Sequence, residues 1–233
     1  MPQVLPLAAR PAPFPLDPAR AAIIVVDMQN DFGSVGGMFD RAGIDISGIG
    51  ATVAPTARVL AAARQAGMAV VYLQMQHRGD LSDMGRPGTA HHDRHQRLGV
   101  GQPVTTPDGQ PSLTLIVDTW GTRIVAGLAP NSGDIVVPKH RFSGFFETPL
   151  HSILQTRGVQ QLVFTGCTTS ICVESTLRDA MFRDYACVLL EDCCAEPIGQ
   201  DNARSNHDAS LLTVEVLLGW VSNSDHFLAA TAG

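Results

Sequence analysis

Apolar runs about the length of a β-strand recur along the chain. The first, AAIIVVDMQ at residues 21–29, is nearly continuous and is typical of a strand buried on both faces of a sheet. Further runs of this kind occur at residues 68–74, 133–139, 161–166 and 186–192. Their length and composition predict the strands of a largely buried sheet.

Segments with helical spacing separate or follow these runs. Residues 53–67 repeat apolar positions at the helical period and end at Gly67, a typical helix stop. Further helices are expected at residues 148–157, 172–184 and 202–218. Because parallel strands need crossover connections of about a dozen residues or more, usually helical, this alternation predicts an α/β fold. We expect a three-layer α/β/α sandwich with a mostly parallel sheet.

The domain organisation follows from the length and from two weakly patterned segments. A chain of 233 residues can bury a substantial core as one domain. Residues 1–20, rich in proline and alanine, are expected to form an extended N-terminal arm before a single domain at residues 21–233. Residues 77–131, rich in glycine, proline and histidine, should carry loops and one short helix over the sheet edge. Whether this segment forms a lid is left open.

The composition narrows the class of partner. Hydrophobic residues make up 45% and charged residues 16%, a globular balance, and no apolar run reaches the length of a membrane span. The net charge of −6 without a run of lysine and arginine disfavours nucleic acid. The N-terminal stretch lacks the pattern of a secretory signal, and five cysteines, an odd number, favour reduced thiols. We expect a cytoplasmic protein with a small-molecule partner and no nucleic-acid or membrane partner.

Three polar residues lie where predicted strands end. Asp27 ends IIVVD, Lys139 ends IVVPK, and Cys172 follows LVFTG after a short loop. Ligands of open α/β sheets bind beyond the carboxyl ends of the strands. Taken singly, these residues could be a turn residue, a solvated charge and a packing residue. Together they would supply a base, an electrostatic orienter and a nucleophile at one sheet edge.

The predicted helix that follows gives the thiol a further property. If this helix begins near Cys172, the positive end of its dipole favours a thiolate there. The unpaired backbone N–H groups of its first turn could also hold an anionic tetrahedral oxygen. One turn of chain would then provide both a nucleophile and an oxyanion hole.

At these residues the sequence resembles the isochorismatase-like cysteine hydrolases, a family of three-layer α/β proteins with a Cys–Asp–Lys triad. The resemblance runs from about residue 21 to 228, and its most specific segments are residues 25–32, 133–154 and 165–193. Within the family, the sequence is most similar to the ureidoacrylate amidohydrolases, through VPKHRFSGFFETPL, CVESTLRD and LLGWVS. The stretch HRGDLSD at residues 77–83 is more similar to biuret- and triuret-type hydrolases. Both subgroups cleave a C–N bond next to a carbamoyl group.

The resemblance also implies a role for each triad residue. Asp27 would take the proton of Cys172 and later help to activate water, while Lys139 would hold the carboxylate and polarise the site. The thiolate would attack a carbonyl carbon, an amine or ammonia would leave, and water would hydrolyse the thioester. A cis peptide is expected at Cys167–Thr168, so that the N–H groups of Thr168 and Cys172 face the oxyanion.

The other cysteines are interpreted as structural residues without a catalytic role. Cys172 is expected to be the nucleophile and Cys167 a bystander that lines the loop. A disulfide between them would consume the nucleophile, and a metal pair would need two further ligands. Cys193 and Cys194 follow an apolar strand and are interpreted as packing residues.

No metal and no cofactor are expected. The nicotinamidases of this superfamily bind a metal through an Asp-x-His pattern with a further histidine, but the corresponding strand end, YLQMQHRGD at residues 72–80, lacks that pattern. His91 and His95 have i,i+4 spacing with Asp93 between them, and could hold a metal if helical. A solvated loop or a substrate-gating segment is the simpler interpretation.

Side chains near the triad are candidates for substrate binding, and they are Phe32, Gln74, Gln76, Arg141, Phe142 and Phe146. Arg141 is the candidate cation for a ureido substrate that carries a carboxylate. The phenylalanines could equally pack in the core or at a dimer interface. Ureidoacrylate enzymes tend to have tyrosine where this chain has Phe142, which leaves the substrate open.

The predicted function is a cysteine-dependent amidohydrolase of a small ureidoacrylate-, biuret- or triuret-like compound, acting through a thioester. Such an enzyme hydrolyses linear amides, which are C–N bonds other than peptide bonds. The alternatives are an isochorismatase-type vinyl ether hydrolase, another small-amide amidase such as an N-carbamoyl amino acid hydrolase, and a non-catalytic binding protein. The family commonly forms oligomers, so we expect a homodimer or homotetramer.

Overall fold

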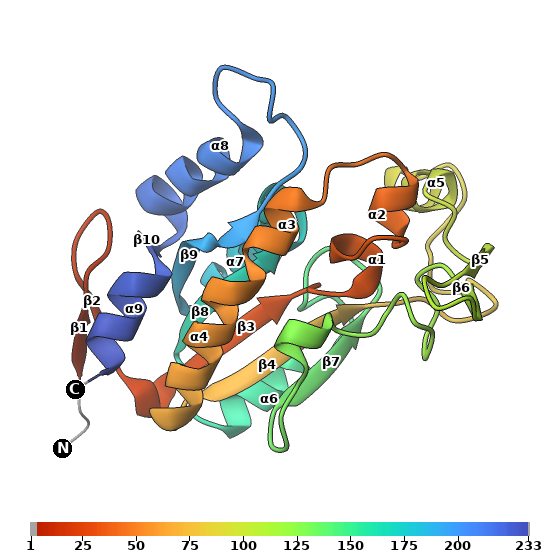
Figure 1. The fold of residues 1–233 in the computed structure, drawn as a ribbon. Helices are drawn as coiled ribbons and strands as arrows, with labels where there is room; N and C mark the ends of the chain where they lie inside the picture. The colour runs from red at the N-terminus through yellow and green to blue at the C-terminus, as the bar shows by residue number, and fades with distance from the viewer. Residues whose placement is uncertain (1–3, 233) are drawn as a thin grey trace.

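A six-stranded parallel sheet forms the centre of the molecule in the computed structural model, which describes residues 4–232. Its strands are β3 (Ala21–Val26), β4 (Ala69–Met75), β7 (Ile135–Lys139), β8 (Gln161–Cys167), β9 (Ala186–Ala195) and β10 (Trp220–Ser222). They lie in the order β10-β9-β8-β3-β4-β7 (Figure 1). The apolar runs of the sequence form five of these strands.

Helices cover both faces of the sheet. They are α4 (Val53–Gln65), α6 (Leu150–Thr156), α7 (Glu174–Met181), α8 (Asn206–Thr213) and α9 (Ser224–Thr231). Alternate residues of β3 point to opposite faces, so Ile23 packs in one core with Val59 of α4, and Ile24 packs in another with Leu177 of α7. The core around α4 also takes in Phe227 of α9. The predicted three-layer sandwich with a parallel sheet is therefore confirmed.

Several short elements complete the chain. They are α1 (Asn30–Gly33), α2 (Met38–Arg41), α3 (Ser47–Ala51), α5 (Ala90–Arg97), the strand pair β5 (Pro103–Thr105) and β6 (Pro111–Leu113), and the 3₁₀ turns η1 (Pro18–Arg20) and η2 (Ala126–Leu128). The short helix expected within residues 77–131 is α5. Figure 1 places it with β5 and β6 at the end of the molecule toward which β3 and β4 point.

Two predicted helices contain a π-helical turn. The helix expected at residues 172–184 begins earlier, with η3 (Thr169–Val173), because the N–H of Val173 closes a five-residue turn on the carbonyl of Thr168 at 3.2 Å. The helix expected at residues 202–218 begins at Asn206 and ends in η4 (Val214–Leu218). Cys172 therefore lies inside a π-helical turn rather than at the start of a helix.

The described part of the expected N-terminal arm, residues 4–20, folds back on itself. β1 (Leu5–Leu7) pairs antiparallel with β2 (Phe14–Leu16), and Leu7, Phe14 and Leu16 are buried in the core. The ring of Phe14 lies 5.0 Å from that of Trp220 in an edge-to-face contact. The apolar side chains of this segment are thus covered by β10 and α9.

The strand order changes direction between β3 and β8. From β3 the chain proceeds through β4 to β7 on one side of the sheet, and then through β8, β9 and β10 on the other. At such a switch point, the loops that leave the two central strands diverge and open a crevice at their carboxyl ends. The fold therefore brings Asp27, which follows β3, next to the chain that follows β8.

Among the described residues, no helix is long and apolar enough to span a membrane.

Close contact between β3 and β8 requires a glycine at the end of β8. Gly166 has φ +115°, and a Cβ built on it would lie 2.1 Å from the carbonyl oxygen of Val26. The backbone of β8 could not approach that of β3 so closely if residue 166 carried a side chain. This approach also sets the distance between Asp27 and the loop that carries Cys172.

We therefore expect Gly166→Ala to destabilise the protein more than Gly158→Ala. Gly158 also has a positive φ, +66°, but a Cβ there would meet nothing within 4 Å. Gly158→Ala, the control, should lower the free energy of unfolding by about 1–2 kcal/mol, because alanine is disfavoured in the left-handed backbone conformation. The steric overlap at Gly166 should add about 1–3 kcal/mol. Urea unfolding of both variants tests this, and equal losses would contradict the packing argument.

Candidate active site

A buried ion pair lies at the carboxyl edge of the sheet. Nζ of Lys139 donates a hydrogen bond of 2.7 Å to Oδ2 of Asp27, and the side chains are 0% and 1% exposed. Burying two such charges is favourable only when each compensates the other and further hydrogen bonds satisfy them. Lys139 makes a second such bond, of 3.0 Å, to the backbone carbonyl of Arg141.

The strands position both members of the pair. Asp27 follows β3 with φ +50°, and its N–H donates to the carbonyl of Leu73 on β4 at 3.0 Å. Lys139 is the last residue of β7 and lies beside Met75, the last residue of β4, in the parallel register. Its side chain passes the sulfur of Met75, 3.6 Å from Nζ, to reach Asp27. The ammonium therefore crosses the end of one strand to bind the carboxylate at the end of the next.

Cys172 completes the triad that the sequence predicts. Its side chain is 9% exposed and lies close enough to interact with both Asp27 and Lys139. Oδ1 of Asp27 has no hydrogen-bond partner among residues 4–232, so it is the oxygen available to accept the thiol proton. The thiol, the carboxylate and the ammonium thus come together from three separate segments.

Burial governs the protonation of these groups. It raises the pKa of Asp27, although the ammonium of Lys139 opposes this shift. Burial alone would lower the pKa of Lys139, but the charges of Asp27 and Cys172 outweigh it and the pKa rises. Burial also raises the pKa of Cys172, which Lys139 lowers and Asp27 raises further. Burial therefore favours the protonated thiol, in contrast to the thiolate expected from the helix dipole.

Hydrogen bonds fix the loop that carries the thiol. The peptide bond Cys167–Thr168 is cis. The carboxylate of Glu196 accepts from the N–H of Ser170 at 2.9 Å and from the N–H of Ile198 at 3.0 Å. Oγ1 of Thr169 lies 2.9 Å from Nδ1 of His207 on α8. The loop that carries Cys172 is therefore hydrogen-bonded to the segment after β9 and to α8.

The triad borders a cavity of about 620 Å³. Asp27, Cys172, Cys167 and Thr168 line its floor. Much of its remaining wall is apolar and is formed by Phe32, Met38, Phe39, Ile44, Met75, Ala90, Leu98, Phe142, Ile171, Pro197 and Ile198. A cavity of this size accommodates a small organic molecule next to the thiol.

The candidate substrate-binding residues divide into two groups. Phe32 and Phe142 line the cavity, whereas Gln74, Gln76, Arg141 and Phe146 do not. Nε2 of Gln74 donates to the carbonyl of Thr122 at 2.7 Å, and the N–H of Gln76 donates to the carbonyl of Lys139 at 2.9 Å. Phe146 is 44% exposed.

The expectation for Arg141 needs correction. Nη1 of Arg141 donates to the backbone carbonyls of Asp83, at 2.5 Å, and His140, at 2.7 Å. The guanidinium therefore holds the loop after β4 and does not reach the cavity. The cations that line the cavity are Arg94 and Arg97 on α5.

The helical spacing of His91 and His95 in the sequence was the signal that could have located this part of the cavity wall. Residues 91, 94 and 95 share one face of α5, Leu98 follows as the C-cap at the same spacing, and all four line the cavity. The segment HHDRH is therefore a helix with His95 buried, not a solvated loop. Asp93 pairs with His92, 3.0 Å away, rather than with His91 or His95.

The other cysteines make no disulfide. All five cysteines lie within the described residues and are free and buried. Sγ of Cys167 donates to the backbone carbonyl of Asp27 at 3.3 Å, so this thiol supports the floor of the cavity. Cys193 and Cys194 are buried in the two cores, as packing residues would be.

Comparison with known proteins agrees with this geometry. Residues 21–225 match the family described as Isochorismatase domain. The chain is 44% identical over 234 residues to ureidoacrylate amidohydrolase RutB of Variovorax paradoxus (strain S110). The alignment covers 99% of this chain and 88% of that protein.

Solved structures share the fold over nearly the whole chain. A cysteine hydrolase from Pseudomonas syringae pv. phaseolicola 1448A is similar with a TM-score of 0.78 and 30% identity, covering 100% of this chain and 99% of that one. N-carbamoylsarcosine amidase from Thermoplasma acidophilum is similar with a TM-score of 0.63 and 27% identity. This match covers 88% of this chain and 97% of that one. From its fold, its sequence match and its kinship with these proteins, the chain belongs to the isochorismatase family.

Proposed function

We propose that this chain is a cysteine-dependent amidohydrolase that cleaves the C–N bond of a small ureido compound through a carbamoyl thioester on Cys172. The observation that carries the proposal is the buried Asp27–Lys139 ion pair beside a thiol that borders a cavity. The wider class, hydrolysis of C–N bonds other than peptide bonds, is the class to which the Variovorax relative and the Thermoplasma amidase belong by name. The enzyme class expected from the sequence is thus confirmed.

The geometry supports a two-stage reaction. In the first stage, the sulfur of Cys172 attacks the carbamoyl carbon while Asp27 accepts the thiol proton. The N–H groups of Thr168 and Cys172, two residues that line the cavity, would receive the oxyanion. Asp27 then returns the proton to the leaving nitrogen as the C–N bond breaks.

Water completes the reaction in the second stage. Asp27 takes a proton from the water that attacks the thioester, the C–S bond breaks to release the thiolate of Cys172, and Asp27 returns the proton to this sulfur. Lys139 stays charged throughout, because its pKa is raised, and so it offsets the negative charge of the neighbouring thiolate. Each proton that leaves the thiol or the water has the same carboxylate as its acceptor.

The cavity favours a substrate with a carboxylate. Arg94 and Arg97 line it, and among residues 4–232 Arg94 makes no side-chain hydrogen bond or ion pair. A free guanidinium at an apolar pocket is suited to bind a carboxylate. Ureidoacrylate and N-carbamoyl amino acids carry one, whereas biuret and triuret do not. We therefore favour ureidoacrylate-like substrates, with N-carbamoyl amino acids as the second candidate.

The cytoplasmic location and the assembly into a dimer or tetramer remain predictions.

The nucleophile is tested by Cys172→Ala, with Cys193→Ala as the control. Cys193 is also buried but packs in the core outside the cavity. We expect Cys172→Ala to lower kcat for ammonia release from ureidoacrylate by at least about 1,000-fold, since this variant lacks the sulfur on which the proposed thioester forms. Cys193→Ala should retain most activity. Substantial turnover by folded Cys172→Ala would contradict the mechanism.

The pH profile tests the base. Only ionised Asp27 can accept the thiol proton, so kcat/KM should fall as the pH drops through its raised pKa. We expect the acid-side midpoint to lie above 3.8, the ordinary value for aspartate. The profile is measured with two substrates of different pKa. A midpoint that belongs to the enzyme is the same for both substrates, whereas a midpoint that belongs to a substrate differs between them. A midpoint at or below 3.8 would oppose Asp27 as the base.

The carboxylate subsite is tested by Arg94→Gln. Loss of a charge-assisted hydrogen bond should raise KM for ureidoacrylate about tenfold, roughly 1.4 kcal/mol, with a smaller change in kcat. Arg78→Gln is the matched control, because Arg78 is also exposed but lies outside the cavity lining. If both variants leave KM unchanged, the carboxylate is bound elsewhere.

A further inference from the structure

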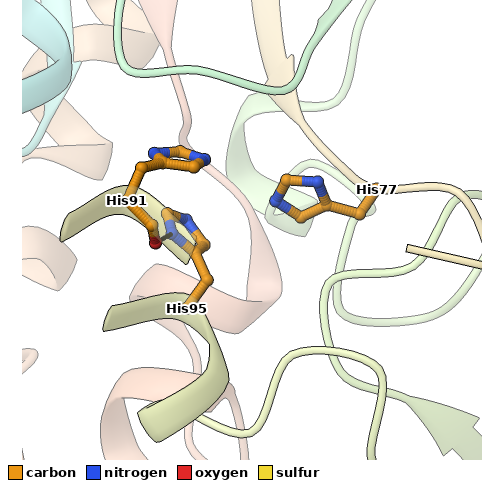
Figure 2. Close-up of side chains that lie close together, drawn as sticks. All are labelled: His77, His91 and His95. Carbon is orange, nitrogen blue, oxygen red and sulfur yellow. Dashed lines mark hydrogen bonds between the residues drawn. The ribbon is translucent and has the colours of Figure 1, made fainter. Parts of the chain in front are cut away.

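Three histidines converge beside the cavity from two segments of the chain. His77 follows β4, and His91 and His95 lie one turn apart on α5 (Figure 2). One ring nitrogen from each can be chosen so that all three lie within 4.8 Å of one another. Figure 2 shows the His77 ring pointing toward the gap between the other two rings.

Neighbouring oxygens orient two of these rings. Nδ1 of His77 lies 3.1 Å from Oδ1 of Asp83, and Nδ1 of His95 lies 2.7 Å from the backbone carbonyl of His91. Because a carboxylate and a carbonyl only accept, both Nδ1 atoms carry the proton and both Nε2 atoms keep a free lone pair. A carboxylate or carbonyl bound to the far nitrogen is the usual support of a metal-binding histidine.

The ring atoms that face one another lack partners. Within the described residues, Nε2 of His77 and Nε2 of His91 are buried without a hydrogen bond. A buried polar atom left unpaired is costly, and such atoms often mark the place of an ion or ligand. Two unpaired nitrogens at one point indicate a shared ligand.

Burial disfavours the protonated, charged form of all three histidines. Burial lowers the pKa of His91 to about 3 and that of His95 to about 4. Burial lowers the pKa of His77 as well, although the carboxylate of Asp83 opposes this shift. These shifts favour neutral imidazoles, but the basis for a shared ligand is the convergence of the three rings and their unpaired nitrogens.

We propose that His77, His91 and His95 form a binding site for one divalent transition-metal ion of the zinc type, held through their Nε2 atoms. Zinc takes imidazole nitrogens at about 2.0–2.1 Å, which sets tetrahedral ligand nitrogens about 3.4 Å apart. Small ring rotations close the present separation of up to 4.8 Å. An all-nitrogen donor set selects zinc, cobalt, nickel or copper over magnesium and calcium.

The rings are partly held in place for this purpose. Phe142 lies against both helical histidines, with ring centroids 5.0 Å from His91 and 6.0 Å from His95. The rings of His91 and His95 are themselves 4.1 Å apart. Less rotational freedom has to be lost on binding, which favours the metal complex.

The ion would join α5 to the end of β4. Because α5 carries Arg94 on the cavity wall, the ion fixes this wall relative to the sheet that carries the triad. His91 and His95 line the cavity as well, so the fourth coordination position is open to water or to an oxygen of a bound molecule. The triad chemistry does not pass through this ion, and the binding claim does not depend on the proposed substrate.

Metal binding is tested with the full-length protein, first stripped with a chelator and then dialysed against Zn²⁺ or Co²⁺. We expect about one ion per chain by elemental analysis, and a Co²⁺ absorption spectrum without a thiolate band. His91→Gln and His95→Gln should each weaken Zn²⁺ binding at least about 100-fold, and Asp83→Asn about 10–100-fold. His92→Gln is the matched control, because His92 is on the same helix but pairs with Asp93 instead.

Three results would overturn the proposal. They are less than stoichiometric binding by the wild type, equal binding by His91→Gln and His92→Gln, and loss of binding in Cys172→Ala with retention in His95→Gln. The last result would place the ion on the catalytic thiol. Circular dichroism checks the fold of each variant, and Asp83→Asn, which keeps all three imidazoles, provides the test if a histidine variant fails to fold.

Discussion

The ion pair between Asp27 and Lys139 is the interaction on which the rest of the site depends. Both side chains are almost fully buried, and each charge removed from water alone would cost several kcal/mol. Their 2.7 Å contact makes the burial tolerable, and it requires the ends of β3 and β7 to lie on either side of β4. The strand order is thus the structural condition for a charged pair inside the protein.

The same burial sets the chemistry of the neighbouring thiol. An isolated buried thiol resists ionisation, and the pKa of Cys172 is raised accordingly. Asp27, whose pKa is also raised by burial, is a stronger base than an exposed carboxylate. In the proposed reaction, burial thus acts on both partners of the proton transfer: it disfavours the thiolate of Cys172 and makes the carboxylate of Asp27 a better proton acceptor.

Much of the fold and the triad could be predicted from the sequence, because strands buried on both faces leave continuous apolar runs and end in polar residues. The strand β10 and the hairpin of β1 and β2 left too weak a signal, since these three-residue strands are buried only through tertiary contacts. The cavity walls were harder still. Arg141 had the right charge and position along the chain, but the carbonyls of Asp83 and His140 hold its guanidinium away from the cavity. His77 joins His91 and His95 only because the chain after β4 folds against α5.

In the proposed reaction, Cys172 carries the carbamoyl group from the first stage to the second. Rapid acid quenching of the wild-type enzyme during turnover of ureidoacrylate, followed by peptide mass spectrometry, tests this most directly. We expect a carbamoyl adduct on Cys172 in its peptide and an unmodified Cys167. Efficient turnover with no adduct on Cys172 in a series of quench times, or an adduct on Cys167 instead, would contradict it.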